Sequence, residues 1–475
     1  MPSERTAGKD CLLSFPADFV WGAAAAAYQV EGAARDDGKG PSVWDRMCGR
    51  AGAIWSGHTG DVACDHYHRY REDVALMKAI GLKAYRLSIS WPRVLPDGVG
   101  KANPAGLDFY DRLIDELLSA GVTPFVTLFH WDYPAALYDR GGWVVRESAD
   151  WFAEYARLMA QRLSDRVECW VTLNEPQVFL GQGHLDGSHA PGDRLPLKQV
   201  LQAGHHVLLA HGKAVQAIRA ASRRPCRVGF APVGVVKIPA TARREDVDAA
   251  RQAMFSISQP GVGNNTWWMD PPYRGEYPRD GLALFGDDAP RVEAGDMETI
   301  HQPLDFFGTN VYSGLIVRAG PSGPEHVPFQ AGHGTTAFRW HVTPEALYWG
   351  PKFLHERYGL PVYITENGMS GTDWVSLDGS VHDPQRIDFL QRYLLEVARA
   401  IDDGVDIRGY FHWSILDNFE WAEGYRERFG LVHVDYLTQT RTPKDSAWWY
   451  REVIASNGRK LHERNGWKPP SAPAR

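Results

Sequence analysis

The sequence has no long apolar run, few cysteines and no excess of basic residues. Nowhere do about 18 uncharged apolar residues follow one another, so no membrane-spanning helix is predicted. The N-terminal segment MPSERTAGKDCLLSFP also lacks the apolar stretch of a signal peptide. The five cysteines are irregularly spaced and include no CxxC pair, which indicates neither a disulfide framework nor a zinc site: Cys11, Cys48, Cys64, Cys169 and Cys226. These absences together favour a cytoplasmic protein.

The charge balance and the scarcity of ligand motifs exclude several function classes. A formal net charge of −7 and a pI near 6.2 argue against a nucleic-acid partner, because phosphate binding requires a basic surface. His66 and His68 stand two apart on a predicted helix and face different directions, which disfavours a metal pair. No GxGxxG follows the first predicted strand, so nucleotide binding lacks its usual motif. We therefore expect neither a metal ion nor a cofactor.

What the sequence does contain is an alternation of short apolar runs with longer amphipathic stretches. The strands are predicted at 19–28, 84–90, 123–129, 169–173, 227–231, 306–311, 362–365 and 407–413. The helices between them are predicted at 67–80, 107–120, 146–163, 200–220, 343–358 and 385–402. This alternation predicts an α/β fold, a single (β/α)8 TIM barrel domain over residues 1–475 with elaborated βα loops, and leaves an open doubly wound sheet as the alternative.

Two segments depart from this regular pattern. The segment 19–28 contains an alanine run that propensity alone would make helical. The segment 318–336 is rich in Gly and Pro, and we expect it to form a loop near the mouth of the barrel.

Polar and aromatic residues gather where the predicted strands end. Barrel strands deliver catalytic groups at their C-terminal ends, so this ring predicts a site. It comprises Gln29, Glu31, Arg86, Ser90, His130, Trp131, Asn174, Glu175, Asn310, Tyr312, Glu366, Asn367, Trp413, Asp417 and Asn418.

Two of these ends place a glutamate directly after an apolar strand, Glu175 in CWVTLNEP and Glu366 in VYITENG. Glycoside hydrolysis needs two such carboxyl groups, one to protonate the leaving oxygen and one to attack the anomeric carbon or activate water. The sequence spacing does not decide between retention and inversion of configuration. The structural alternative is that Glu175 begins a helix, with Pro176 in its first turn, and that Glu366 caps a turn.

Four motifs make the interpretation more specific: FVWGAAAAAYQVEGA at 19–33, TLNEP at 172–176, ITENG at 364–368 and HWSILDNFEWAEGYRERFGLVHVD at 412–435. Together and in this order they resemble glycoside hydrolase family 1, the β-glucosidase family. The resemblance implies a retaining, exo-acting β-glucosidase that removes terminal β-D-glucosyl residues, and β-fucosyl or β-galactosyl residues as well, by double displacement. It implies Glu175 as general acid/base and Glu366 as nucleophile.

The resemblance also implies the other site residues. Arg86 and Tyr312 would contact the nucleophile, and Asn174 would bind the sugar 2-hydroxyl. Further substrate-binding residues would be Gln29, His130, Trp131, Asn310, Trp340, Trp413, Glu420, Trp421 and Phe429. Small β-glycosides and oligosaccharides such as cellobiose are the expected substrates, and a homo-oligomer is left open.

One departure from the family pattern concerns the leaving group. Many members carry Trp directly after the NEP motif, whereas this chain has Gln177. We expect a stacking surface to be missing at one edge of the entrance, and the preferred aglycone and glycone epimer stay open. The alternatives are an endo-acting β-glucanase with an open groove, and a catalytically silent sugar-binding protein.

Overall fold

The computed structural model describes residues 14–463, so Cys11 and most of the N-terminal segment considered above lie outside the described residues. Parallel strands close into a barrel in the order β1-β11-β10-β7-β5-β4-β3-β2. They are β1 (Val20–Ala24), β2 (Ala84–Ser88), β3 (Thr123–Phe129), β4 (Cys169–Asn174), β5 (Arg227–Ala231), β7 (Phe306–Asn310), β10 (Val362–Asn367) and β11 (Ile407–Trp413). The predicted (β/α)8 barrel is confirmed.

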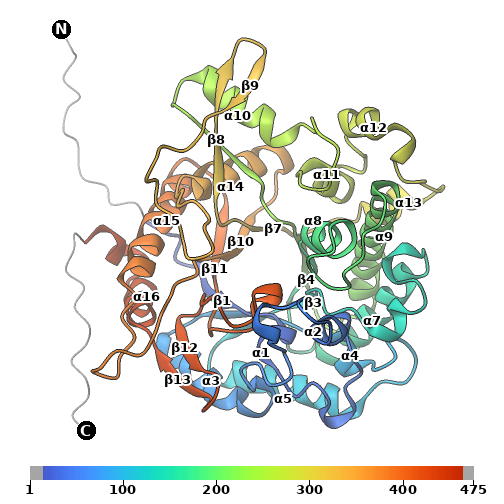
Figure 1. The fold of residues 1–475 in the computed structure, drawn as a ribbon, viewed down its shortest axis with the longest axis vertical. Coiled ribbons are helices and arrows are strands. Elements are labelled where there is room, and N and C mark those ends of the chain that lie inside the picture. Colours follow the sequence, from blue (N-terminus) through green and yellow to red (C-terminus); the bar gives the residue numbers. More distant parts are fainter. Residues whose placement is uncertain (1–13, 464–475) are drawn as a thin grey trace.

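Helices surround the barrel, as Figure 1 shows. The long ones are α3 (His66–Ile80), α5 (Pro104–Ser119), α7 (Ser148–Leu163), α9 (Leu197–Ala221), α14 (Ala346–Tyr358), α15 (Pro384–Asp402) and α16 (Asp445–Ala455). Other helices lie in the loops, and all except the 12-residue α10 have nine residues or fewer: α1 (Ala27–Val30), α2 (Val43–Cys48), α4 (Trp91–Val94), α6 (Ala135–Tyr138), α8 (Pro176–Leu180), α10 (Arg244–Phe255), α11 (Thr266–Arg274), α12 (Arg279–Phe285) and α13 (Asp296–Ile300). Sequence signals explain several boundaries, since α3 ends at the left-handed Gly81 and proline opens α5 and α15.

A layer of aromatic rings fills part of the barrel interior. Phe125 packs against Phe411 with ring centroids 4.9 Å apart, and against Tyr363 at 5.6 Å. Glycines make room for these rings, because a Cβ atom on Gly22 would approach Phe411 to 2.5 Å. The interior is thus a packed core, and open space is confined to the ends of the strands.

The prediction for segment 19–28 is correct only in its first half. The strand β1 ends at Ala24, and the chain then forms the short helix α1. Ala23 and Ala24 are fully buried between β2 and β11, where only small side chains fit. Strand pairing on both sides therefore overrides the helical propensity of the alanine run.

The prediction that segment 318–336 forms a loop is wrong for its first part. β8 (Gly314–Gly320) pairs with β6 (Val236–Pro239) and with β9 (Gly323–His326) in a separate three-stranded sheet. In Figure 1 this sheet extends beyond the end of the barrel beside α10. A second small sheet pairs β12 (Val432–Asp435) with β13 (Thr440–Pro443). Among residues 14–463, no helix is long and apolar enough to cross a bilayer.

Candidate active site

The two glutamates predicted from the strand ends lie in one cavity of about 530 Å³. Glu366 is part of β10, and Glu175 directly follows β4 at the N-terminus of α8. The backbone of Glu175 is left-handed, with φ of 49°, as is that of Trp131 and Trp421, which line the same cavity. Such backbone strain costs of order 1–3 kcal/mol per residue and concentrates at functional sites.

Glu175 is bound by neutral groups. The amide Nδ2 of Asn310 donates to Glu175 Oε1 at 2.8 Å and to Asn174 Oδ1 at 3.0 Å. Glu175 itself is only 6% exposed. Since no cation contacts this carboxyl among the ion pairs of residues 14–463, its charged form is poorly stabilised.

Glu366 has the opposite environment. Nη1 of Arg86 donates to Glu366 Oε1 at 2.5 Å, and the hydroxyl of Tyr312 donates to Glu366 Oε2 at 2.7 Å. Arg86 is held in turn by Thr127 and by Asn174 Oδ1. The predicted contacts of Arg86 and Tyr312 with Glu366 are therefore present, and both favour the ionised carboxylate.

These environments give the two carboxyl groups different affinities for a proton. Burial, together with the neighbouring charge of Glu366, raises the pKa of Glu175 to about 8. Burial also raises the pKa of Glu366, but Arg86 and Tyr312 act in the opposite direction. The two environments therefore favour the proton on Glu175 and the negative charge on Glu366.

One end of the cavity is lined by hydrogen-bonding groups from distant parts of the chain. Nε2 of Gln29 donates to Asn418 Oδ1 at 3.0 Å and lies 3.4 Å from Glu420 Oε2. Within the described chain Gln29 Oε1 has no hydrogen-bond partner, so it is available to accept from a ligand. Burial, with the charge of Glu366, raises the pKa of Glu420 to about 8. Hydroxyl donors from a ligand would favour the ionised form of Glu420.

Flat aromatic faces enclose the same end. Trp413 and the ring of His130 stack with centroids 5.5 Å apart, and Trp131 lies 4.7 Å from Trp421. Burial lowers the pKa of His130 well below its usual range, so the imidazole is neutral. Neutral aromatic walls beside polar groups suit the alternating apolar faces and hydroxyl edges of a pyranose.

The structure brings the predicted site residues together. Those that line the cavity are His130, Trp131, Glu175, Tyr312, Trp340, Glu366, Trp413, Glu420, Trp421 and Phe429. The other four residues implied by the family resemblance are almost completely buried behind them: Gln29, Arg86, Asn174 and Asn310. Five further members of the ring predicted from the strand ends are buried and do not line the cavity: Glu31, Ser90, Asn367, Asp417 and Asn418.

The sequence analysis missed an aliphatic wall of the cavity. Val178 from α8, Val233 and Val235 from the loop after β5, and Leu315 from β8 form this wall. Val233 lies just beyond a strand end, where a site residue is expected, but a search for polar and aromatic residues passes over it.

Gln177 has a role that the sequence analysis did not predict. Its side chain is 4% exposed, its Nε2 donates to the carbonyl of Val233 at 3.2 Å, and its Oε1 accepts from the amide of Val233 at 3.4 Å. The residue does not line the cavity. It fixes the loop after β5, and it gives the cavity no stacking surface at this position.

Two glutamates at the strand ends of the barrel face one cavity, and their surroundings favour the protonated form of one and the ionised form of the other. This arrangement is typical of glycoside hydrolases. Within residues 14–463, no group of three or more His, Cys, Asp or Glu side chains is arranged to hold a metal ion. The sequence model of glycosyl hydrolase family 1 matches residues 12–459, and the chain belongs to this family.

Characterised relatives cover nearly the whole chain. The 1,4-β-D-glucan glucohydrolase of Thermotoga neapolitana is 47% identical over 449 residues, which is 94% of this chain and 99% of the relative. The bifunctional β-D-glucosidase/β-D-fucosidase of Bifidobacterium breve is 41% identical, with 94% and 99% covered. The structure of the Thermotoga maritima β-glucosidase in complex with glucoimidazole has a TM-score of 0.86 at 45% identity, with 94% and 100% covered.

Proposed function

We propose that this protein is an exo-acting, retaining β-glucosidase that removes terminal non-reducing β-D-glucosyl residues and also accepts β-fucosides and β-galactosides. The observation that carries the proposal is the unequal pair of carboxyl groups, Glu175 neutral and Glu366 ionised, in one cavity. Family membership and the names of the relatives support the same activity.

In the first step Glu366 attacks the anomeric carbon of the bound glycoside. The bond from this carbon to the leaving oxygen breaks, and Glu175 transfers its proton to that oxygen. In this proposal Asn174 binds the sugar 2-hydroxyl. Support comes from its Oδ1, which accepts hydrogen bonds from Arg86 and Asn310, the residues that contact Glu366 and Glu175. The product of the step is a covalent glycosyl ester of Glu366 and a free aglycone alcohol.

In the second step water replaces Glu366 at the anomeric carbon. The ester removes the negative charge of Glu366, so the pKa of Glu175 falls and its carboxylate can take a proton from water. The hydroxyl oxygen bonds to the anomeric carbon, the ester bond breaks, and Glu366 leaves as a carboxylate. Two inversions give net retention of the β-configuration.

A closed end of the cavity favours exo-action over cleavage within a chain. Glu420 and Trp421 line this end, and Gln29 lies buried behind Glu420 at 3.4 Å from its Oε2. An endo-acting glucanase needs a groove that continues past both sides of the scissile bond, so a sugar chain would meet this wall. Cellobiose and short β-linked oligosaccharides are therefore the proposed natural class of substrate, and the cytoplasm is the proposed location.

Hydrolysis of a panel of p-nitrophenyl glycosides tests the proposed reaction. The β-glucoside, β-galactoside and β-fucoside should release nitrophenol, while the α-glucoside and the β-glucoside 6-phosphate should not. Proton NMR of the first sugar product should show the β-anomer. Folded protein without activity on any of the panel would favour a binding role, and an initial α-anomer would contradict retention.

Azide rescue assigns the roles of the two glutamates. In Glu366→Ala the cavity admits azide in place of the carboxylate, and we expect an α-glycosyl azide from an activated glucoside. In Glu175→Ala, azide should attack the glycosyl-enzyme intermediate and give the β-glycosyl azide. The opposite stereochemistry would reverse the two assignments.

A further inference from the structure

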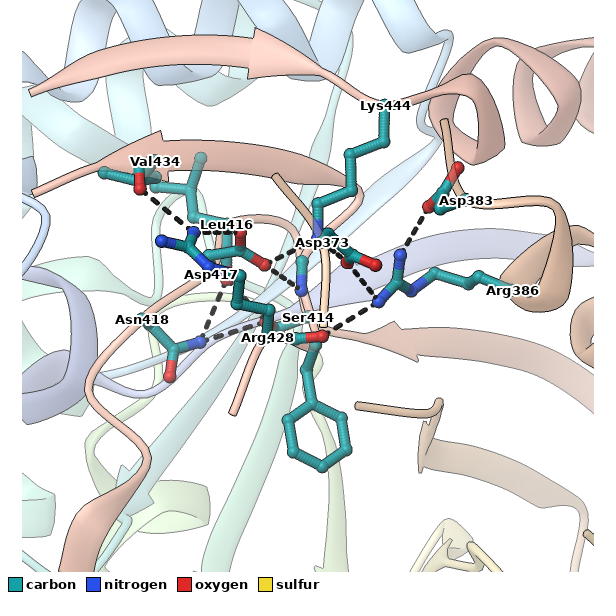
Figure 2. Close-up of polar contacts among 12 residues, drawn as sticks. Asp373, Asp383, Arg386, Ser414, Leu416, Asp417, Asn418, Arg428, Val434 and Lys444 are labelled. Atoms are coloured by element: carbon teal, nitrogen blue, oxygen red, sulfur yellow. Dashed lines mark hydrogen bonds and ion pairs between the residues drawn. The ribbon is translucent and has the colours of Figure 1, made fainter. Parts of the chain in front are cut away.

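A buried cluster of six charged residues lies behind the cavity, outside the residues that the reaction uses. Figure 2 shows its members and the polar contacts that connect them. Its members are Asp373, Asp383, Arg386, Asp417, Arg428 and Lys444, three acids and three bases, and we call them the ion cluster.

Lys444 and Asp417 form its centre. Both side chains are completely buried, and Lys444 Nζ lies 2.7 Å from Asp417 Oδ1 and 2.6 Å from Asp373 Oδ2. Arg428 Nη1 lies 2.7 Å from Asp417 Oδ2. Arg386 completes the cluster by pairing with Asp373 at 2.7 Å and with Asp383.

The ion cluster joins segments that carry different parts of the site. Asp373 belongs to the segment that leaves β10 after Glu366, whereas Asp417 and Arg428 belong to the loop that carries Glu420. Backbone contacts reinforce the connection, because the carbonyl of Arg428 accepts from Arg386 Nη2 at 2.8 Å and from the amide of Gly371 at 2.9 Å.

Asp417 leads directly to the sugar-binding end of the cavity. Its Oδ1 also accepts from the amide of Gly430 at 2.9 Å, which closes the loop on itself. The next residue, Asn418, accepts from Gln29 Nε2, and that same nitrogen lies 3.4 Å from Glu420 Oε2. A series of polar contacts thus runs from Lys444 and Arg428 to Asp417, and from the adjacent Asn418 to Gln29 and Glu420.

Stability alone does not account for such a cluster. The cost of removing charges from water often equals or exceeds their mutual attraction, and well-packed apolar residues can replace buried ion pairs without loss of stability. What apolar residues do not supply is directional hydrogen bonding, which fixes neighbouring loops to within fractions of an ångström. A site that recognises hydroxyl groups depends on this precision.

We propose that the ion cluster is a positioning device for glycone recognition, in which Lys444 and Arg428 hold Asp417 so that Gln29 and Glu420 face the substrate hydroxyls. The inference rests on the proposed β-glucosidase function. The members of the ion cluster touch no reacting atom, and they act through the loop after β11. The family resemblance implies that Glu420 accepts hydrogen bonds from the 4- and 6-hydroxyls of a hexose, so the device matters most for a substrate that carries the hydroxymethyl group.

The test compares kcat/KM for p-nitrophenyl β-glucoside with that for the β-xyloside, which lacks the hydroxymethyl group. Arg428→Met removes one charge at the partly exposed rim of the ion cluster, where the side chain is 19% exposed. We expect the glucoside-to-xyloside ratio to fall about tenfold, because misplacement of about 1 Å can cost up to about 100-fold in rate. Arg428→Lys keeps the positive charge beside Asp417 but not the planar guanidinium, so it should lower the ratio less than Arg428→Met does.

The control variant is Arg392→Met, which removes an exposed ion pair with Asp388 on α15 and should leave the ratio unchanged. A lower Tm for Arg428→Met with an unchanged ratio would overturn the proposal, since the ion cluster would then only stabilise the fold. If Arg428→Met does not fold, Arg428→Gln replaces it in the same comparison.

Inhibitor binding separates this proposal from the proposed function. Dissociation constants of deoxynojirimycin and of its analogue without the hydroxymethyl group need no turnover, and calorimetry measures both. A wild-type protein that binds deoxynojirimycin but hydrolyses no glycoside would refute the function, and the ratio of the two constants in Arg428→Met would still test the ion cluster. If the wild-type protein does not distinguish the two inhibitors, the positioning proposal is overturned.

Discussion

Removal of one hydroxyl group, in Tyr312→Phe, should change the protonation of the proposed nucleophile without changing its shape. The Tyr312 hydroxyl donates to Glu366 Oε2 at 2.7 Å, and its ring lies 4.9 Å from Trp340. Phenylalanine keeps the ring contacts. Burial, with the charge of Glu366, raises the pKa of Tyr312 well above its usual range, so the wild-type residue remains a donor throughout the working pH range.

The expected change in the pKa of Glu366 follows from the strength of a buried hydrogen bond to a charged group. Such a bond contributes about 1.5–3 kcal/mol, and 1.36 kcal/mol corresponds to one pKa unit. Loss of the donor disfavours the carboxylate, so the pKa of Glu366 should rise by about 1–2 units. The reaction needs ionised Glu366, and the acid limb of the kcat/KM profile should therefore move upward by the same amount.

The assay is the pH dependence of kcat/KM for p-nitrophenyl β-glucoside from pH 4 to 10, measured for wild type and Tyr312→Phe. Tyr138→Phe is the matched control, because it also removes a hydroxyl donor from a carboxylate, Asp193 at 2.6 Å, but neither residue lines the cavity. The control should leave the profile unchanged. An acid limb that stays in place in Tyr312→Phe would refute the argument that this hydrogen bond keeps Glu366 ionised.

Three further predictions concern the rest of the site. Since Glu175 must be protonated and its pKa is raised to about 8, kcat/KM should fall as the pH rises through that value, and an activity that holds to pH 10 would contradict the assignment. Glu420→Gln should lower kcat/KM for the β-glucoside about 100-fold, by loss of charge-assisted hydrogen bonds, and that for the β-xyloside much less. Gln177→Ala frees the loop at Val233 and should raise KM for glucosides with bulky aryl aglycones. The kcat for the 2,4-dinitrophenyl glucoside should stay unchanged. Equal effects on all aglycones would contradict this role of Gln177.

The barrel and the two glutamates were predictable because they depend on short-range patterns. Apolar runs of the correct length gave strands whose C-terminal ends must meet at one edge, which places Glu175 and Glu366 together without any knowledge of their distance. The contacts of Arg86 and Tyr312 with Glu366 required more than spacing, and only the resemblance to a family indicated them.

The errors came from elements whose neighbours decide their conformation. The alanines of β1 form a strand because β2 and β11 enclose them, and no local signal reports those partners. In the same way β8 and β9 form a hairpin in a segment that composition marks as a loop, with Arg318 and Glu325 paired across it at 3.1 Å. The pairing of β8 with β6 does depend on a distant segment, and no local signal reports that partner.

Gln177 shows why a residue that departs from a family pattern is hard to interpret from sequence. The absence of Trp at this position predicted a missing stacking surface, but residue identity reports which group is absent and not which contact replaces it. The amide forms two hydrogen bonds with the backbone of Val233, and Val178 lines the cavity in its place. If the Val233 loop sets the width of the entrance, aglycone preference is controlled by a backbone that Gln177 holds, and a substitution at this position changes specificity without removing any contact to the substrate.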